Sequence, residues 1–131
     1  MDAMSTQLSP RLVVAGAARA IDFYVTVFDA KEIVRYTHDD GTIVHAELAI
    51  GDSVIMIKEE DGGDPGPVTL GGSPVLMALK VDDADAVGER MLAAGSTVVF
   101  PIDDQDYGEV QERGGRLKDP FGHLWIISQP L

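Results

Sequence analysis

The chain has 131 residues, 45% of them apolar, which is enough to bury the core of one domain without cross-links. It contains no cysteine, which excludes disulfides, thiolate zinc sites and thiol nucleophiles and suits a reducing compartment. Ten Lys and Arg residues against 22 Asp and Glu residues give a formal net charge of −12, so nucleic acids and anionic membrane surfaces are unfavourable partners.

The beginning of the sequence carries no sign of export. Residues 1–12 contain neither a basic nor an apolar region of the kind found in signal peptides, and no stretch reaches the roughly 18 apolar residues of a membrane span. We therefore expect a cytoplasmic protein that does not bind membranes. The acidic charge is typical of a solubilising surface, and attraction of a cationic ligand is the alternative.

The first half of the chain predicts a strand, a helix and then three strands. Mixed apolar residues at 8–14 are typical of a strand, and residues 17–28 place apolar side chains on one helical face. β-type sequence follows at 32–36, 43–50 and 53–57. Gly51 and Asp52 lie between the last two runs and suit the positive φ angles of a two-residue hairpin turn.

Residues 59–73 separate this half from the next. They read EEDGGDPGPVTLGGS, which is rich in Gly, Pro and acidic residues and has almost no apolar periodicity. This composition indicates a flexible linker and not a binding motif.

The second half repeats the order of the first. A strand is predicted at 75–81, a helix at 84–94 that ends at Gly95, and further strands at 97–100, 115–118 and 123–128. The strand starts at Leu8 and Val75 give an internal repeat of about 67 residues.

This repeat predicts an α+β fold within a single domain, 1–131. Residues 7–58 and 74–131 each form a βαβββ module, and neither module can cover both faces of its own sheet. Pairing them gives a cupped mixed sheet with the helices on the outside. The open concave side is the expected place for a ligand.

Three segments of the sequence resemble a known superfamily: AARAIDFYVTVFDAKEIVRY, HAELAIGDSVIMIKEE and DPFGHLWIISQP. They are similar to the vicinal oxygen chelate proteins, which include glyoxalases, bleomycin resistance proteins and extradiol dioxygenases, and especially to the PhnB-like branch. The resemblance covers nearly the whole chain and implies the paired βαβββ fold. It also implies a homodimer, because members of this fold commonly dimerise, and it leaves the reaction open.

The resemblance implies four positions for a metal ligand, on the first and last strand of each module. Counting from Phe23 and from the two hairpin glycines, these positions fall at Ser9, Leu76, Ile55 and Ile126. None of these side chains is an imidazole, carboxylate or thiolate, and shifting the register by one residue supplies none either. We therefore expect no metal and no other cofactor.

Each histidine has a structural explanation. His38 lies in a polar loop sequence, where we expect a solvated side chain. His45 and Glu47 share one face of a strand, and an ion pair or hydrogen bond is favoured over a metal pair. His123 belongs to the DPFGH turn of the resembling family, for which a loop hydrogen bond is favoured over catalysis.

Strand alternation predicts which residues line the cup. On the first strand of each module, one face is wholly apolar and the other is mixed, and the mixed face is assigned to the cup. Tyr107 matches an aromatic residue of the resembling family and either stacks on a planar ligand or anchors its loop. The predicted ligand-binding residues are Ser9, Arg11, Val13, Ile55, Ile57, Leu76, Ala78, Lys80, Tyr107, Ile126 and Ser128.

A lining of this kind suits a hydrophobic or planar small molecule. The sequence therefore favours a metal-free binding protein that sequesters an antibiotic or a similar compound, with no catalytic residue assigned. A metal-dependent glyoxalase-like lyase or isomerase, or a dioxygenase, is the alternative, and it requires ligands that the sequence lacks. A metal-independent enzyme that uses Arg11, His45 or Tyr107 as acid or base is a third possibility.

Overall fold

The first half of the chain forms a mixed four-stranded sheet with one helix on one side. The computed structural model describes residues 5–131. In this first unit, the N-module, the elements are β1 (Arg11–Val14), α1 (Ala17–Phe28), β2 (Lys31–Thr37), β3 (Ile43–Ile50) and β4 (Ser53–Glu59). The strand order is β1-β4-β3-β2, with β1 parallel to β4 and the other neighbours antiparallel.

The second half, the C-module, repeats this topology. Its elements are β5 (Leu76–Lys80), α3 (Ala84–Ala93), β6 (Thr97–Asp106), β7 (Gln111–Lys118) and β8 (Leu124–Pro130). The strand order β5-β8-β7-β6 matches that of the N-module position by position, and β5 is parallel to β8. The predicted α+β fold of two βαβββ modules is therefore confirmed.

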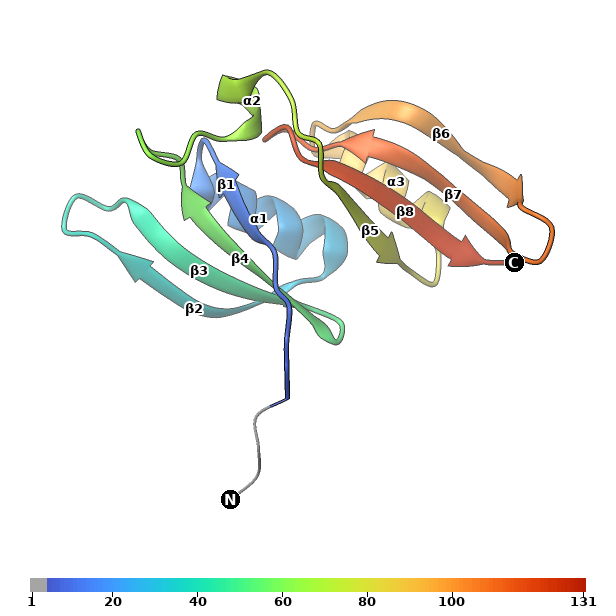
Figure 1. Cartoon of the computed structure of the whole chain (residues 1–131), viewed down its shortest axis with the longest axis horizontal. Helices are drawn as coiled ribbons and strands as arrows, with labels where there is room; N and C mark the ends of the chain where they lie inside the picture. Colours follow the sequence, from blue (N-terminus) through green and yellow to red (C-terminus); the bar gives the residue numbers. More distant parts are fainter. Residues whose placement is uncertain (1–4) are drawn as a thin grey trace.

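The two modules lie side by side with both long helices behind the sheets (Figure 1). The edge strands β1 and β5 face each other across the middle of the molecule (Figure 1). Among residues 5–131 no ladder joins these two edges, so the strands form two separate sheets. In the same range, no helix is long and apolar enough to cross a membrane.

Helix α1 holds the two modules together. The rings of Tyr24 and Phe28 pack against Trp125 of β8, with centroid distances of 5.5 and 4.6 Å. Arg90 of α3 donates a 3.2 Å hydrogen bond to the carbonyl of Val27 at the end of α1. One helix thus contributes to the core of its own sheet and to that of the other module.

Asp119, in the turn before β8, is the polar centre of this shared core. Its carboxylate accepts hydrogen bonds from the Tyr24 hydroxyl, from Trp125 Nε1 at 2.9 Å, and from the backbone N–H groups of Phe121 and His123 at 2.9 and 3.0 Å. Burial, followed by the charge of Asp119, raises the pKa of Tyr24 well above its usual value. The buried carboxylate is therefore matched by donors from both modules.

The start of α1 has an unusual cap. Gly16 has a φ of 101°, a left-handed conformation that favours glycine, and glycine has no side chain that could cap the helix. Instead, the carboxylate of Glu59 at the end of β4 accepts 2.8 Å hydrogen bonds from the backbone N–H groups of Gly16 and Ala17. The negative charge of this carboxylate is also stabilised by the positive end of the helix dipole.

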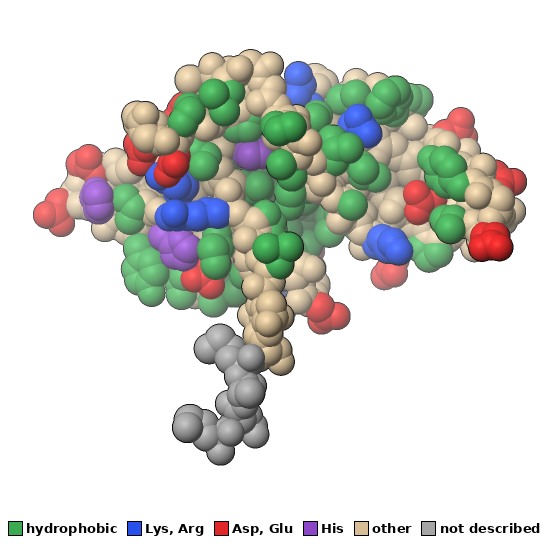
Figure 2. All heavy atoms as spheres, in the orientation of Figure 1, with side chains coloured by type: hydrophobic (Ala, Val, Ile, Leu, Met, Phe, Trp, Pro, Cys, Tyr) green, Lys and Arg blue, Asp and Glu red, His purple; other side chains and the backbone are tan. Residues whose placement is uncertain are grey.

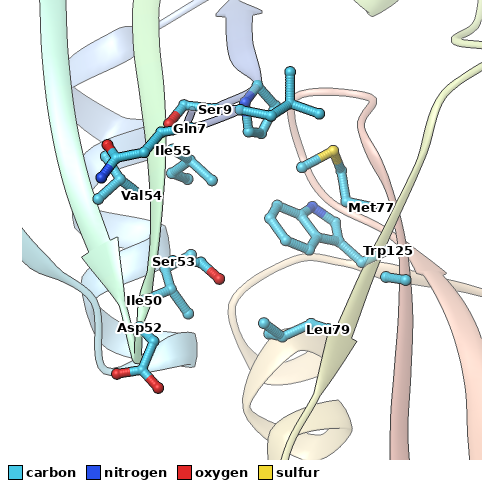
Figure 3. Close-up of a pocket in the computed structure, with 13 residues that line it drawn as sticks. Gln7, Ser9, Ile50, Asp52, Ser53, Val54, Ile55, Met77, Leu79 and Trp125 are labelled. Atoms are coloured by element: carbon cyan, nitrogen blue, oxygen red, sulfur yellow. The ribbon is translucent and has the colours of Figure 1, made fainter. Parts of the chain in front are cut away.

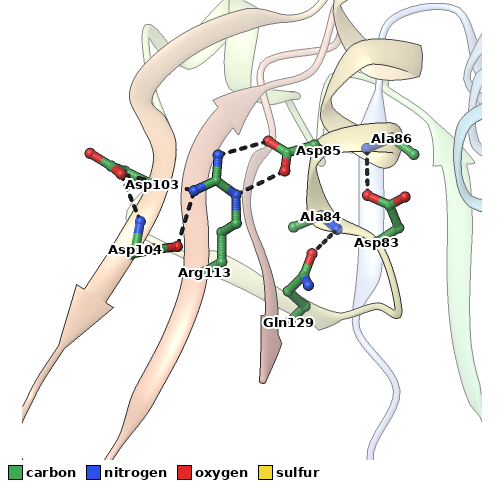
Figure 4. A network of polar contacts seen from close by, with 8 residues as sticks. All are labelled: Asp83, Ala84, Asp85, Ala86, Asp103, Asp104, Arg113 and Gln129. Carbon is green, nitrogen blue, oxygen red and sulfur yellow. Dashed lines mark hydrogen bonds and ion pairs between the residues drawn. The ribbon is translucent and has the colours of Figure 1, made fainter. Parts of the chain in front are cut away.

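Strands β6 and β7 are longer than the sequence predicts. Pairing runs outward as far as Asp106 opposite Gln111, through a polar segment without the apolar alternation of a strand. Arg113 of β7 stabilises this extension, because its guanidinium binds Asp85 of α3 at 2.8 and 3.1 Å and Asp104 of β6 at 3.0 Å (Figure 4). Charge pairing here replaces apolar burial, which explains why periodicity does not reveal the strands.

The connection between the modules has local structure. It contains one helical turn, α2 (Pro67–Leu70), which begins with proline and is followed by Gly71 at a φ of 84°. Before it, the Lys58 ammonium binds the carboxylates of Asp61 and Asp64 at 2.8 and 2.6 Å. These contacts fix the chain where it leaves β4.

Candidate functional site

Each sheet has an open face, which we define as the face turned away from the helices. Strand pairing assigns the residues, because directly paired residues project to the same side of a sheet. On the N-module, Arg11 pairs with Met56 and Met56 with Glu47. On the C-module, Ala78 pairs with Ile126 and Ile126 with Arg116. Figure 2 views the molecule from this side.

Ile55 and Ile57 lie on the face opposite to the one predicted. They pair with Leu48 and Leu12 and are 4% and 0% exposed in the core beside α1. Val54, Met56 and Lys58, by alternation, are the open-face residues of β4.

The turns explain this error. β3 and β4 pair at Ile50 and Ser53, so only residues 51–52 lie between them, whereas β7 and β8 pair at Lys118 and Leu124 and enclose residues 119–123. Gly51 is the first residue of the β3–β4 turn, whereas Gly122 lies late in the β7–β8 turn. Treating these two glycines as equivalent shifts β4 by one residue relative to β8. A shift of one residue moves every side chain of a strand to the opposite face of the sheet.

The other predicted lining residues lie on the expected side. Arg11 and Val13 share the open face of β1, and register assigns Leu76, Ala78, Lys80, Ile126 and Ser128 to the open face of the C-module. Ser9 lies just before β1. These placements concern geometry, and ligand binding by these residues stays a prediction.

A pocket of about 400 Å³ lies on the open face of the C-module. Its wall contains two large exposed aromatic side chains, Phe100 of β6 and Tyr107 of the β6–β7 turn, which are 57% and 67% exposed. We call it the β6–β7 pocket, and its lining is Phe100, Gln105, Tyr107, Glu112, Gly114, Gly115, Arg116 and Ile126.

Glycine creates the hollow in this pocket. Gly114 is the open-face residue of β7 between Glu112 and Arg116, so no side chain fills the space between those two. A Cβ at Gly114 would lie 2.8 Å from the carbonyl oxygen of Ile127 and 2.9 Å from Ser128 Cβ. The close approach of β7 to β8 therefore requires glycine here, and it leaves the pocket open.

A groove of about 410 Å³ separates the two modules. Figure 3 shows Ser9 and Ile55 on its N-module side, facing Met77, Leu79 and Trp125 of the C-module. A larger hollow of about 930 Å³ beside it contains the predicted residues Lys80 and Ser128. Seven of the eleven predicted lining residues are thus divided among three depressions, and only Tyr107 and Ile126 lie in the β6–β7 pocket. The other four, Arg11, Val13, Ile57 and Leu76, line none of the three.

His45 and Glu47 project from the open face of the N-module. Their Nε2 and Oε2 atoms lie 2.9 Å apart, in agreement with the predicted pair, and the ring of Tyr36 stacks on the imidazole at 5.9 Å. His38 is exposed, also as predicted. His123 Nε2 lies 2.9 Å from the carbonyl oxygen of Val13, so its hydrogen bond joins the two modules.

The donor set of the open faces does not fit a transition metal. The open-face positions on and beside the first and last strands include Ser9, just before β1, Arg11 on β1, Met56 on β4, Ala78 on β5 and Ile126 on β8. Within residues 5–131, no group of three or more His, Cys, Asp or Glu side chains converges. His45 and Glu47 supply two donors, fewer than the three or four protein ligands that such sites use.

Sequence reasoning missed part of the pocket. Phe100 follows a bulge in β6, and Arg116 lies in a Gly-rich strand without apolar alternation, so neither position shows its face in the sequence. In the sequence Phe100 continues the apolar run of Val98 and Val99, so no signal there sets its side chain apart.

These features define a class of protein with two paired βαβββ modules and a ligand-accessible open face. The model of the Glyoxalase/Bleomycin resistance protein/Dioxygenase superfamily matches residues 6–127, and the chain belongs to this superfamily.

Relatives and solved structures agree with this assignment. An uncharacterized protein of Mycobacterium bovis is 45% identical over 129 residues, which cover 95% of this chain and 83% of the relative. The structure of TioX from Micromonospora sp. ML1 has a TM-score of 0.70 at 27% identity, over 96% of this chain and 97% of TioX. The fosfomycin resistance protein FosX from Mesorhizobium loti has a TM-score of 0.67 at 19% identity, over 95% and 91% of the two chains, and shows the fold.

Proposed function

We propose that this protein is a metal-free binding protein that sequesters a hydrophobic or aromatic small molecule, with an antibiotic as the expected ligand class. The observation that carries the proposal is the β6–β7 pocket, in which Phe100 and Tyr107 expose aromatic rings to a concave surface. Exposed aromatic side chains around a hollow are typical of ligand sites.

The energetics support a planar ligand. Burying about 200 Å² of apolar surface would contribute about 5 kcal/mol before ordering costs, at roughly 25 cal/mol per Å². Stacking against two aromatic rings adds about 0.5–1.5 kcal/mol for each pair. Before ordering costs these contributions together amount to about 6–8 kcal/mol, so micromolar affinity is about the upper limit that they allow without a metal.

We further propose that the protein is a homodimer. The unpaired edges of β1 and β5 and the groove between the modules offer apolar surface to a second copy. Light scattering on a size-exclusion column should give twice the mass of one chain, and a monomeric mass at micromolar concentration would contradict the dimer.

Metal analysis and thermal-shift titration test the binding proposal. Purified tag-free protein should contain no stoichiometric metal, and its melting temperature should rise saturably with a planar aromatic antibiotic but not with Ni²⁺, Mn²⁺, Fe²⁺ or Zn²⁺. Tyr107→Ala should reduce the antibiotic shift. Tyr36→Ala, which removes an exposed tyrosine from the other module, is the matched control. A saturable rise in melting temperature with a metal would contradict the metal-free proposal and favour the alternative of a metal-dependent enzyme.

A further inference from the structure

Positive charge gathers on the open faces although the protein as a whole is acidic. Strand register assigns six of the ten Lys and Arg residues to these faces, but only three of the 22 acidic residues, namely Glu47, Asp103 and Glu112. The six cations are Arg11, Lys31, Lys58, Lys80, Arg116 and Lys118. Figure 2 shows Lys and Arg side chains spread across this view, with acidic side chains at both ends and at some places between them.

Arg116 is the cation inside the β6–β7 pocket. Its guanidinium carbon lies 5.1 Å from the centre of the Phe100 ring. Its Nε atom is buried and has no hydrogen-bond partner, and no carboxylate of residues 5–131 lies within 4.0 Å of the guanidinium. The guanidinium is thus without an anionic partner from the described chain, and an acceptor bound in the pocket would supply one through a charge-assisted hydrogen bond.

We infer that the ligand is a planar aromatic anion, whose carboxylate, sulfonate or similar group pairs with Arg116 while its ring system contacts Phe100, Tyr107 and Ile126. This inference rests on the proposed binding function and specifies its ligand class. The excess of acid over the whole chain thus lies mostly outside the open faces, on which cations outnumber acidic residues.

Glu112 sets the orientation of such a ligand. It lines the same pocket but lies four residues before Arg116 on β7, about 13 Å away along an extended strand. An anionic group is therefore attracted to the Arg116 end and repelled from the Glu112 end. The neutral or cationic end of the ligand should point to Glu112 and Gln105.

A pair of fluorescent probes tests the inference. 8-Anilinonaphthalene-1-sulfonate and N-phenyl-1-naphthylamine share one aromatic body, and only the first carries a sulfonate. The folded protein should bind the sulfonate about tenfold more tightly, and Arg116→Met should remove this preference while leaving the affinity for the neutral probe unchanged. Arg35→Met removes a charge that pairs with Glu32 away from the pocket and should change neither affinity.

Each outcome has a distinct meaning. Retention of the tenfold preference in folded Arg116→Met protein, or equal affinity of wild-type protein for both probes, would overturn the inference and leave the proposed function standing. Failure of both probes to bind would overturn the two together. If Arg116→Met does not fold, Arg116→Lys should keep the preference for the sulfonate. Independently of the variants, added salt should weaken the binding of the sulfonate to wild-type protein and leave the binding of the neutral probe unchanged. Salt-independent binding of the sulfonate would contradict the inference.

Discussion

Asp119 concentrates the polar contacts of the shared core in one carboxylate. Four donors converge on it, two from the side chains of Tyr24 and Trp125 and two from the backbone. An aspartate accepts at both oxygens, which is why this residue type fits a site that consists entirely of donors.

Asp119→Asn should therefore destabilise the protein strongly. The amide has one oxygen and brings two new donors, so at least one buried donor loses its partner, at a cost of about 2–4 kcal/mol in the free energy of unfolding. Urea denaturation checks this value. Tyr24→Phe, which removes one donor and leaves the carboxylate bonded to the others, should cost less. Equal stability of Asp119→Asn and wild type would contradict the role of the network.

Tyr24 should not ionise while the protein is folded. Its pKa is raised in the folded state, so the contribution of Tyr24 to the free energy of unfolding is fully present below the ordinary tyrosine pKa of 10.0. This contribution is lost as the pH rises above 10.0, because the unfolded state releases the proton more readily. Absorbance at the tyrosinate band should therefore change in wild type and in Tyr24→Phe by the same amount until alkaline unfolding begins. A larger change in wild type before unfolding would contradict this expectation.

At the scale of elements, the Lys58–Asp61 contact fixes the chain beyond β4 and has a clear pH signature. Bonding to Lys58 and to two backbone N–H groups lowers the pKa of Asp61 from 3.8 to about 2. The stabilisation is thus present above the unfolded value and is lost as the pH falls through 2.

Asp61→Asn removes the charge but keeps an oxygen for the N–H groups of Gly63 and Asp64. Wild type should exceed this variant in urea midpoint by a constant amount above about pH 5, and the difference should shrink as the pH falls through 2 and vanish near about pH 1. Asp39→Asn, in an exposed loop, serves as the control. A pH-independent difference would exclude the ion pair as its source.

The element order was predictable from the sequence because helices and apolar strands have clear periods. Three features were not. The outer ends of β6 and β7 are stabilised by Arg113 and its acidic partners, which leave no periodic pattern. The face of β4 depended on a turn length that differs between the modules. Phe100 and Arg116 meet only through tertiary pairing across a bulge. The fold was therefore more accessible to prediction than the site.

At the scale of the whole molecule, the modules share one core and should unfold as one unit. Phe28 of α1 is buried against Trp125 of β8. Phe28→Ala should lower the free energy of unfolding by about 3–5 kcal/mol, and the transitions followed by Trp125 fluorescence and by far-ultraviolet circular dichroism should coincide. Separate transitions would indicate that each module folds alone.

The shared helix also has a consequence for biosynthesis. The Tyr24 hydroxyl bonds to a residue 95 positions later in the sequence, so α1 leaves the ribosome long before its partners in the C-module exist. At about 5–20 residues per second, its aromatic face stays without those partners for about 5–20 seconds. The nascent N-module is the species that a chaperone should recognise, and release should follow once β8 has been synthesised.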